Sequence, residues 1–154
     1  MTKKQFDCII ILVTIIVIVF ERRICLATLK YSRQRESIKE YLNSSCEHPT
    51  ADMVYLHVKE EYPNISLGTV YRNLNLLADL GEAIKITTPN GGDRFDGRIF
   101  PHYHFCCTSC GKVEDLDLEE LTFVNEAAAK NFEGIIESHA MMFYGKCRDC
   151  VKAN

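Results

Sequence analysis

With 154 residues and 47% hydrophobic content, the chain is long enough to bury a core, which excludes a wholly disordered protein. The formal net charge of −3 gives no broad basic surface of the kind that many nucleic-acid-binding proteins carry. Any DNA contact must therefore come from a few local features.

An apolar run at residues 8–20 (CIIILVTIIVIVF) stands near the beginning of the chain, between basic residues. It is shorter than the roughly 20 residues that span a bilayer, and no small-x-small cleavage site of a signal peptide follows it. We therefore expect residues 1–27 to be an apolar extension that reflects a start assigned too far upstream, with the domain opening near 26–29. A weak membrane anchor is the alternative.

Three short helices are expected next, at about residues 32–43, 50–61 and 66–81. The third is the best delimited, because Ser66 is a good N-cap residue and Gly81 stands where a C′ glycine belongs. One face of this third helix is aliphatic, formed by Leu67, Val70, Leu74 and Leu77. The other face is polar and small, formed by Gly68, Thr69, Arg72 and Asn75. Such a helix can enter a DNA groove.

Two strand-like segments, 83–88 and 93–96, flank the turn signal at 89–92. Three helices followed by a hairpin make a winged helix, in which the hairpin can contact DNA beside the groove. The sequence therefore predicts an α+β protein whose residues 28–97 form a winged-helix DNA-binding domain.

Residues 98–154 form the second expected domain, a small α/β dimerisation and metal-binding domain. Its predicted elements are strands at 102–107 and 112–116, a helix at 118–132 and a strand at 135–144. Because so small a domain has a thin core, we expect a metal or a partner subunit to stabilise it.

Two Cys-x-x-Cys pairs, Cys107 with Cys110 and Cys147 with Cys150, supply the four thiolates of a closed tetrahedral zinc site. Such a site is structural, and the alternative is a redox-active or unligated set of thiols. Thiolate ligands must stay reduced, which predicts the cytoplasm. Cys106 points to the other strand face and is expected to be a buried apolar residue.

A second constellation consists of His102 and His104 on one strand face, with Asp96 and Asp115 within reach on flanking segments. Mixed nitrogen and oxygen ligands favour manganese, iron(II) or zinc. The alternative is a solvated strand face without a metal. Considered alone, His48 is interpreted as a cap or surface histidine and not as a metal ligand.

Residues 30–150 resemble the ferric uptake regulator (Fur) family, and more narrowly its peroxide-sensing (PerR-like) branch. The matching motifs are Ser32-Arg33-Gln34-Arg35, His48-Pro49-Thr50-Ala51, Ser66-x-x-Thr69-Val70-Tyr71-Arg72-Asn73-Leu74, Arg94-Phe95-Asp96, His102-Tyr103-His104, the first cysteine pair with Gly111, and Tyr144-Gly145. Both candidate carboxylates are Asp, which resembles the peroxide-sensing branch, since the iron-uptake and zinc-uptake branches commonly place Glu there.

The resemblance implies structural zinc on the four cysteines. It implies a regulatory Fe²⁺ or Mn²⁺ that bridges the two halves, held by His48, Asp96, His102, His104 and Asp115. It implies DNA contacts, to the bases by Tyr71 and Arg72 and elsewhere by Arg33, Arg35, Thr69 and Asn73. His139 matches a position that serves a further metal site in some members, and the alternative is an ordinary strand histidine.

The expected protein is thus a cytoplasmic homodimeric repressor without enzyme activity or a small-molecule substrate. The regulatory ion would lock the dimer onto operator DNA with inverted-repeat half-sites, and with iron(II) bound, peroxide would oxidise His48 or His102. An iron- or zinc-uptake regulator is the nearest alternative. A non-haem metalloenzyme and a zinc-ribbon interaction module are two others.

Overall fold

The computed structural model describes residues 30–89 and 92–153. The chain from Arg33 onward forms one compact unit. The expected apolar extension at 1–27 lies outside the described residues, as does part of the turn at 89–92. Within the described ranges no helix combines the length and the apolar character that crossing a membrane requires.

The three predicted helices are present as α2 (Arg33–Ser44), α3 (Ala51–Glu61) and α4 (Leu67–Asp79). Their starts are fixed by local hydrogen bonds, since the Met53 N–H donates to the Thr50 hydroxyl and the Thr69 N–H donates to the Ser66 hydroxyl. These bonds satisfy backbone donors that the first helical turn leaves without partners. The predicted helix starts are therefore confirmed within one residue.

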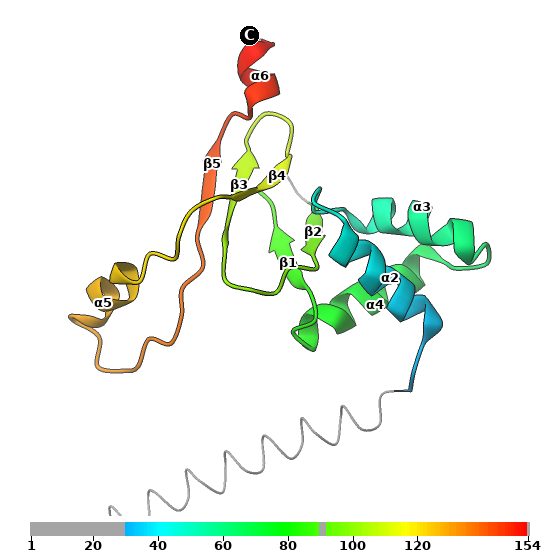
Figure 1. Cartoon of the computed structure of the whole chain (residues 1–154), viewed down its shortest axis with the longest axis horizontal. Helices are drawn as coiled ribbons and strands as arrows, with labels where there is room; N and C mark the ends of the chain where they lie inside the picture. The colour runs from blue at the N-terminus through cyan, green and yellow to red at the C-terminus, as the bar shows by residue number, and fades with distance from the viewer. Residues whose placement is uncertain (1–29, 90–91, 154) are drawn as a thin grey trace, which may run out of the picture. The chain divides into compact units, whose positions relative to one another are not determined.

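The three helices pack against one another, with β1 (Ile84–Thr87) and β2 (Asp93–Asp96) beside them (Figure 1). Their shared core consists of Ile38, Leu42, Ala51, Val54, Val58, Ile65, Val70, Leu74, Leu77, Ala83 and Phe95. In α4 the aliphatic face is buried except for the half-buried Leu67, whereas Tyr71 and Arg72 are exposed. The amphipathic pattern in the sequence thus placed this helix correctly.

The hairpin is antiparallel and is held against the beginning of α3. Ile84 pairs with Asp96 in its register, and the Phe95 N–H donates to the Pro49 carbonyl at 3.0 Å. An isolated bridge joins Thr50 to Arg94. These contacts bring Asp96, at the end of β2, next to His48.

The second half contains a three-stranded sheet in the order β4-β3-β5, formed by β3 (Tyr103–Cys107), β4 (Val113–Leu116) and β5 (Met142–Gly145). β4 runs antiparallel to β3, and β5 runs parallel to it. The predicted strand at 135–144 is wrong for residues 135–141, because β3 provides ladder partners only to Met142–Gly145.

The helix expected at 118–132 is also shorter in the structure, where α5 covers Phe123–Ala129 and lies on an arm away from the sheet (Figure 1). None of its residues is buried, so no packing extends it, and helices depend mostly on packing for stability. A short helix that was not predicted, α6 (Arg148–Lys152), contains the last cysteine.

Candidate metal centres

Five side chains from four places in the chain meet beside the connector between the helical half and the sheet. His48 lies two residues before Thr50, the N-cap of α3, and has a φ of 47°, the only positive φ outside glycine in the described chain. Asp96 ends β2, His102 immediately precedes β3, and His104 is the second residue of β3. Asp115 of β4 pairs directly with His104, so the strand register places it at the same cluster.

Each of the five residues directs one atom toward a common centre, and these atoms all lie within 4.8 Å of one another. Asp96 Oδ2 is 3.0 Å from His102 Nε2, 3.4 Å from His104 Nε2 and 3.6 Å from His48 Nε2. Asp115 Oδ1 lies 2.8, 3.2 and 3.6 Å from the Nε2 atoms of His48, His102 and His104 respectively.

These atoms fit a bound ion better than they fit one another. His48 Nε2, His102 Nε2 and Asp115 Oδ1 are buried and have no hydrogen-bond partner, although oppositely charged groups are close. An unsatisfied buried polar atom is costly, and a metal removes that cost. Nitrogen and oxygen ligands sit about 2.0–2.2 Å from such an ion, which separates octahedral neighbours by about 3 Å. The observed separations match that spacing.

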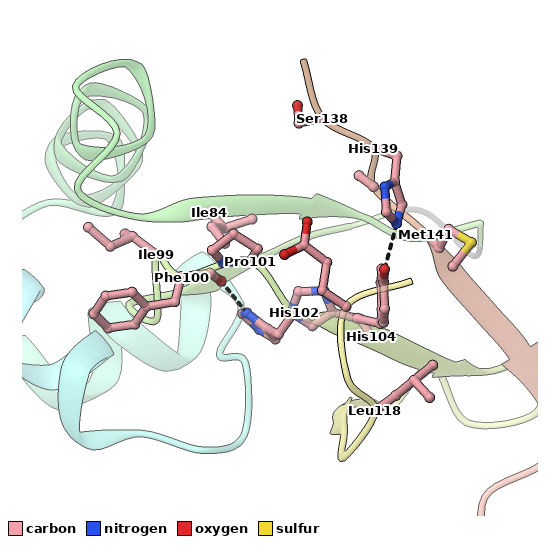
Figure 2. A pocket seen from close by; sticks show the side chains of 13 residues that line it. Ile84, Ile99, Phe100, Pro101, His102, His104, Leu118, Ser138, His139 and Met141 are labelled. Atoms are coloured by element: carbon pink, nitrogen blue, oxygen red, sulfur yellow. Dashed lines mark hydrogen bonds between the residues drawn. The ribbon is translucent and has the colours of Figure 1, made fainter. Parts of the chain in front are cut away.

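The tautomer of His102 is set by the backbone. Figure 2 shows His102 and His104 beside a cavity of about 280 Å³, where His102 Nδ1 lies 2.7 Å from the Phe100 carbonyl oxygen. A carbonyl only accepts, so Nδ1–H is the donor and the lone pair on Nε2 faces the cluster. This is the arrangement of a metal-ligating histidine, whose other nitrogen is oriented by an outer hydrogen bond.

Neighbouring groups in the cluster shift the pKa values of Asp96 and His48. Burial works to raise the pKa of Asp96, but the nearby His104 and His48 rings and the hydrogen bond from the Arg98 N–H outweigh it and hold that pKa well below its usual range. Burial likewise works to lower the pKa of His48, but the carboxylates of Asp96 and Asp115 outweigh it and raise that pKa. A buried carboxylate that stays ionised attracts a cation.

The four cysteines of the two pairs form the second cluster, with their sulfur atoms within 4.8 Å of one another. Cys110 Sγ lies 3.8 Å from Cys147 Sγ, which equals the separation of about 3.8 Å that a tetrahedron of Zn–S bonds of about 2.3 Å gives. Hydrogen bonds from the N–H groups of Cys147 and Cys110 lower the pKa of Cys107 to about 6. Hydrogen bonding with Cys147 raises the pKa of Cys150 to about 12.

The α4 residues expected at DNA divide into two groups. Tyr71 and Arg72 present exposed side chains. The Thr69 hydroxyl is bonded to Ser66 and accepts from Arg72 Nη2 at 3.0 Å, and Asn73 Nδ2 donates to the Thr69 carbonyl. Polar groups of Thr69 and Asn73 are therefore used within the helix, and the Thr69 hydroxyl orients the Arg72 side chain.

Arg33 and Arg35 both lie in the first turn of α2, and Arg33 is exposed whereas Arg35 is half-buried. His139 is not part of either cluster. Its Nε2 is hydrogen-bonded to the Tyr103 hydroxyl and its Nδ1 lies 2.9 Å from Asn125 Oδ1. Both ring nitrogens are thus occupied by protein partners, which favours the structural interpretation of this histidine.

Sequence reasoning did not single out Arg98, which the structure places at the first cluster. Its N–H donates to Asp96 Oδ1 at 2.8 Å, and its Nη1 donates to Asp115 Oδ2 at 3.0 Å. No motif marks an arginine in a connector, so the signal is only visible in three dimensions. Cys106 behaves as predicted, because it is buried between Ile86 and Val113 and its burial raises its pKa.

The model of the "Ferric uptake regulator family" matches residues 27–144. Two curated relatives, both called "Peroxide-responsive repressor PerR", come from Staphylococcus aureus (strain Mu50) and Staphylococcus epidermidis. Each is 36% identical over 124 residues, which cover 80% of this chain and 84% and 83% of the respective relatives.

Solved structures of ferric uptake and peroxide stress regulators are also similar to this chain. The chain superposes on the Helicobacter pylori ferric uptake regulator Fur, described as having three functional metal-binding sites, with a TM-score of 0.73 and 26% identity over 88% of this chain and 91% of that one. The Campylobacter jejuni peroxide stress regulator matches with a TM-score of 0.67 and 34% identity, over 76% of this chain and 88% of that one.

Proposed function

The chain belongs to the ferric uptake regulator family, and we propose that it is a metal-dependent, peroxide-responsive transcriptional repressor that binds operator DNA as a homodimer. One observation carries the metal dependence. Three imidazoles and two carboxylates, drawn from both sides of the connector after β2, converge with unsatisfied buried atoms.

The regulatory site acts as a clamp between residues 28–97 and 98–154. His48 and Asp96 belong to the first part, and His102, His104 and Asp115 belong to the second. When all five side chains hold one Fe²⁺ or Mn²⁺, the angle between the two parts is fixed. The ion and operator DNA both favour this closed form. Operator DNA therefore raises the metal affinity by the same factor by which the metal raises the DNA affinity. Zinc on the four cysteines is structural.

DNA binding uses the exposed face of α4. Tyr71 and Arg72 face the groove, and Arg33 and Arg35 lie near the backbone. Two copies of α4 in a dimer read inverted half-sites about one helical turn apart, or a multiple of that. With a net charge of −3, affinity comes from these few groups and from the doubling that dimerisation supplies.

The second half offers apolar surface to a partner subunit. Its exposed large hydrophobic side chains are Ile99, Phe100, Leu118, Phe123, Phe132, Ile135, Phe143, Tyr144 and Val151. An apolar surface of this kind is typical of a protein–protein interface. We assign it to the homodimer and place the protein in the cytoplasm, where the cysteines stay reduced.

The peroxide response is supported by the curated relatives, which carry that function in their names, and by Asp at both carboxylate positions. His48 and His102 are the ligands that we expect to gain an oxygen atom. In that reaction the imidazole would give two electrons to peroxide, one peroxide oxygen would join the ring and the other would leave as water. Iron(II), when bound, would mediate the transfer in one-electron steps, whereas manganese(II) would not.

The test is a fluorescence-anisotropy titration of the promoter upstream of the protein's own gene, with chelator, Mn²⁺, Fe²⁺ or Zn²⁺ and with or without peroxide. We expect tight binding with Mn²⁺ or Fe²⁺, and its loss after peroxide only in the iron form, with added oxygen on His48 or His102 in the mass spectrum. Arg72→Ala should weaken binding, and Lys59→Ala on α3 is its control. Metal-independent binding would overturn the clamp, and a peroxide-insensitive iron form would favour an iron- or zinc-uptake regulator.

A further inference from the structure

Arg98 holds one oxygen atom of each carboxylate in the regulatory cluster. Its backbone N–H donates to Asp96 Oδ1 at 2.8 Å, and its guanidinium donates to Asp115 Oδ2 at 3.0 Å. The other two oxygens, Asp96 Oδ2 and Asp115 Oδ1, are the ones that face the three imidazoles. A single residue therefore decides which oxygen each carboxylate presents.

This division of the oxygens limits the coordination number. With Asp96 Oδ1 and Asp115 Oδ2 held by Arg98, the other oxygen of each carboxylate is the one that would face an ion. Three nitrogens and two oxygens would supply five ligand atoms, and an ion that prefers six ligands would keep one position for a further one. A cavity of about 390 Å³, lined by His48, Asp96, Arg98, Asp115 and the end of α2, adjoins the cluster. A small ligand can reach the ion from that side.

The backbone next to Arg98 is fixed by close packing. A Cβ atom on Gly97 would lie 2.5 Å from Asn43 Oδ1 and 2.7 Å from Asn43 N, which no side chain tolerates. Only glycine lets the connector pass this close to the end of α2. The packing holds the connector that carries Asp96 and Arg98 against the end of α2, and the Arg98 guanidinium reaches Asp115 in β4.

We propose that Arg98 is a positioning residue for the regulatory ion: it holds Asp96 and Asp115 in one-oxygen coordination and so presets a five-ligand site. The proposal rests on the regulatory site proposed above. Its energetic basis is preorganisation, since an exposed ion pair adds little stability by itself and the Arg98 side chain is 59% exposed. Outer hydrogen-bond partners of metal ligands typically change metal affinity about 10- to 100-fold when they are removed.

The experiment compares Mn²⁺ affinity, by calorimetry, and the electron paramagnetic resonance spectrum of bound Mn²⁺ for zinc-loaded wild type, Arg98→Gln and Arg98→Lys. Arg98→Gln keeps the N–H that holds Asp96 but releases Asp115. We expect about a 10-fold or greater loss of affinity and a changed spectrum, because both Asp115 oxygens become available to the ion. Arg98→Lys, which keeps a donor and a positive charge, should recover part of the affinity.

Lys39→Gln is the matched control, because Lys39 and Glu82 form another partly exposed ion pair, 2.8 Å long. It should bind Mn²⁺ like the wild type. In combination with Asp115→Ala, Arg98→Gln should add no further loss, since Arg98 acts through that carboxylate. Affinity within twofold of wild type and an unchanged spectrum for Arg98→Gln would overturn the proposal. If His104→Ala also keeps its Mn²⁺, the regulatory site itself is wrong, so the two failures are distinct.

Discussion

The Nε2 atom of His48 lies 2.8 Å from Oδ1 of Asp115, although one residue precedes α3 and the other belongs to β4. Neither atom has a hydrogen-bond partner of good geometry. The segment that precedes α3 and strand β4 are therefore joined most strongly when both of these atoms bind the same cation. The metal content of the protein should depend on this cluster and on the cysteines independently.

Replacing His104 with alanine should remove the regulatory ion and leave the structural zinc. The ring is buried, and its Nε2 is one of the five converging atoms, so the variant has no replacement ligand. Metal analysis should find about one zinc per chain and a Mn²⁺ affinity lowered by more than about 100-fold, beyond the loss of an outer partner. His57→Ala is the control, because His57 stacks on Tyr41 in the helical half. Wild-type Mn²⁺ affinity in His104→Ala would refute the assigned ligand set.

Replacing Cys110 with serine should destabilise the second half of the protein. Its sulfur belongs to the four-cysteine cluster, and a structural zinc contributes its binding free energy to folding. We expect loss of the zinc and a melting temperature lowered by 10 °C or more, on the order of several kcal/mol. Cys46→Ser is the matched control, since Cys46 is exposed and outside the cluster. Retention of zinc in Cys110→Ser would contradict the prediction.

Tyr103→Phe should cost stability without affecting the regulatory site. The buried Tyr103 hydroxyl accepts from the Leu121 N–H at 2.8 Å and bonds to His139, so its removal leaves both partners unsatisfied. Urea unfolding of the zinc-loaded protein should show a loss of about 1–3 kcal/mol. The exposed Tyr31 is the control, and Tyr31→Phe should change stability by less than about 0.5 kcal/mol. A lowered Mn²⁺ affinity in Tyr103→Phe would show that the network also supports the metal.

Metal affinity at the regulatory site should rise with pH between 6 and 8. His48 must lose its proton before Nε2 can bind an ion, and its pKa lies above the ordinary 6.5. Protons therefore compete more as the pH falls, whereas Asp96 stays ionised throughout because its pKa is lowered. Below the pKa of His48 the affinity should drop by about tenfold per pH unit for one released proton. Calorimetry in buffers of different ionisation enthalpy measures how many protons are released when the metal binds. A metal affinity that does not change with pH would exclude this competition.

Local signals predicted the helical half well. Ser66 and Thr50 cap helices by accepting hydrogen bonds from residues three positions later in the chain. The aliphatic periodicity of α4 can be recognised within that helix alone. The second half was predicted less accurately. Residues 135–141 carry a strand-like pattern, but a strand needs a ladder partner, and β3 pairs only with Met142–Gly145. Similarly, α5 is short because nothing covers it.

The sequence by itself determined the ligand chemistry of both clusters, because the side chains of cysteine, histidine and aspartate limit the classes of metal that can bind. It also predicted which residues share a strand face, since that depends only on the alternation within one strand. Only the tertiary structure decided which oxygen of Asp96 and of Asp115 faces the imidazoles. That choice depends on the β3–β4 register and on the packing of Gly97 against Asn43, which join residues far apart in the chain.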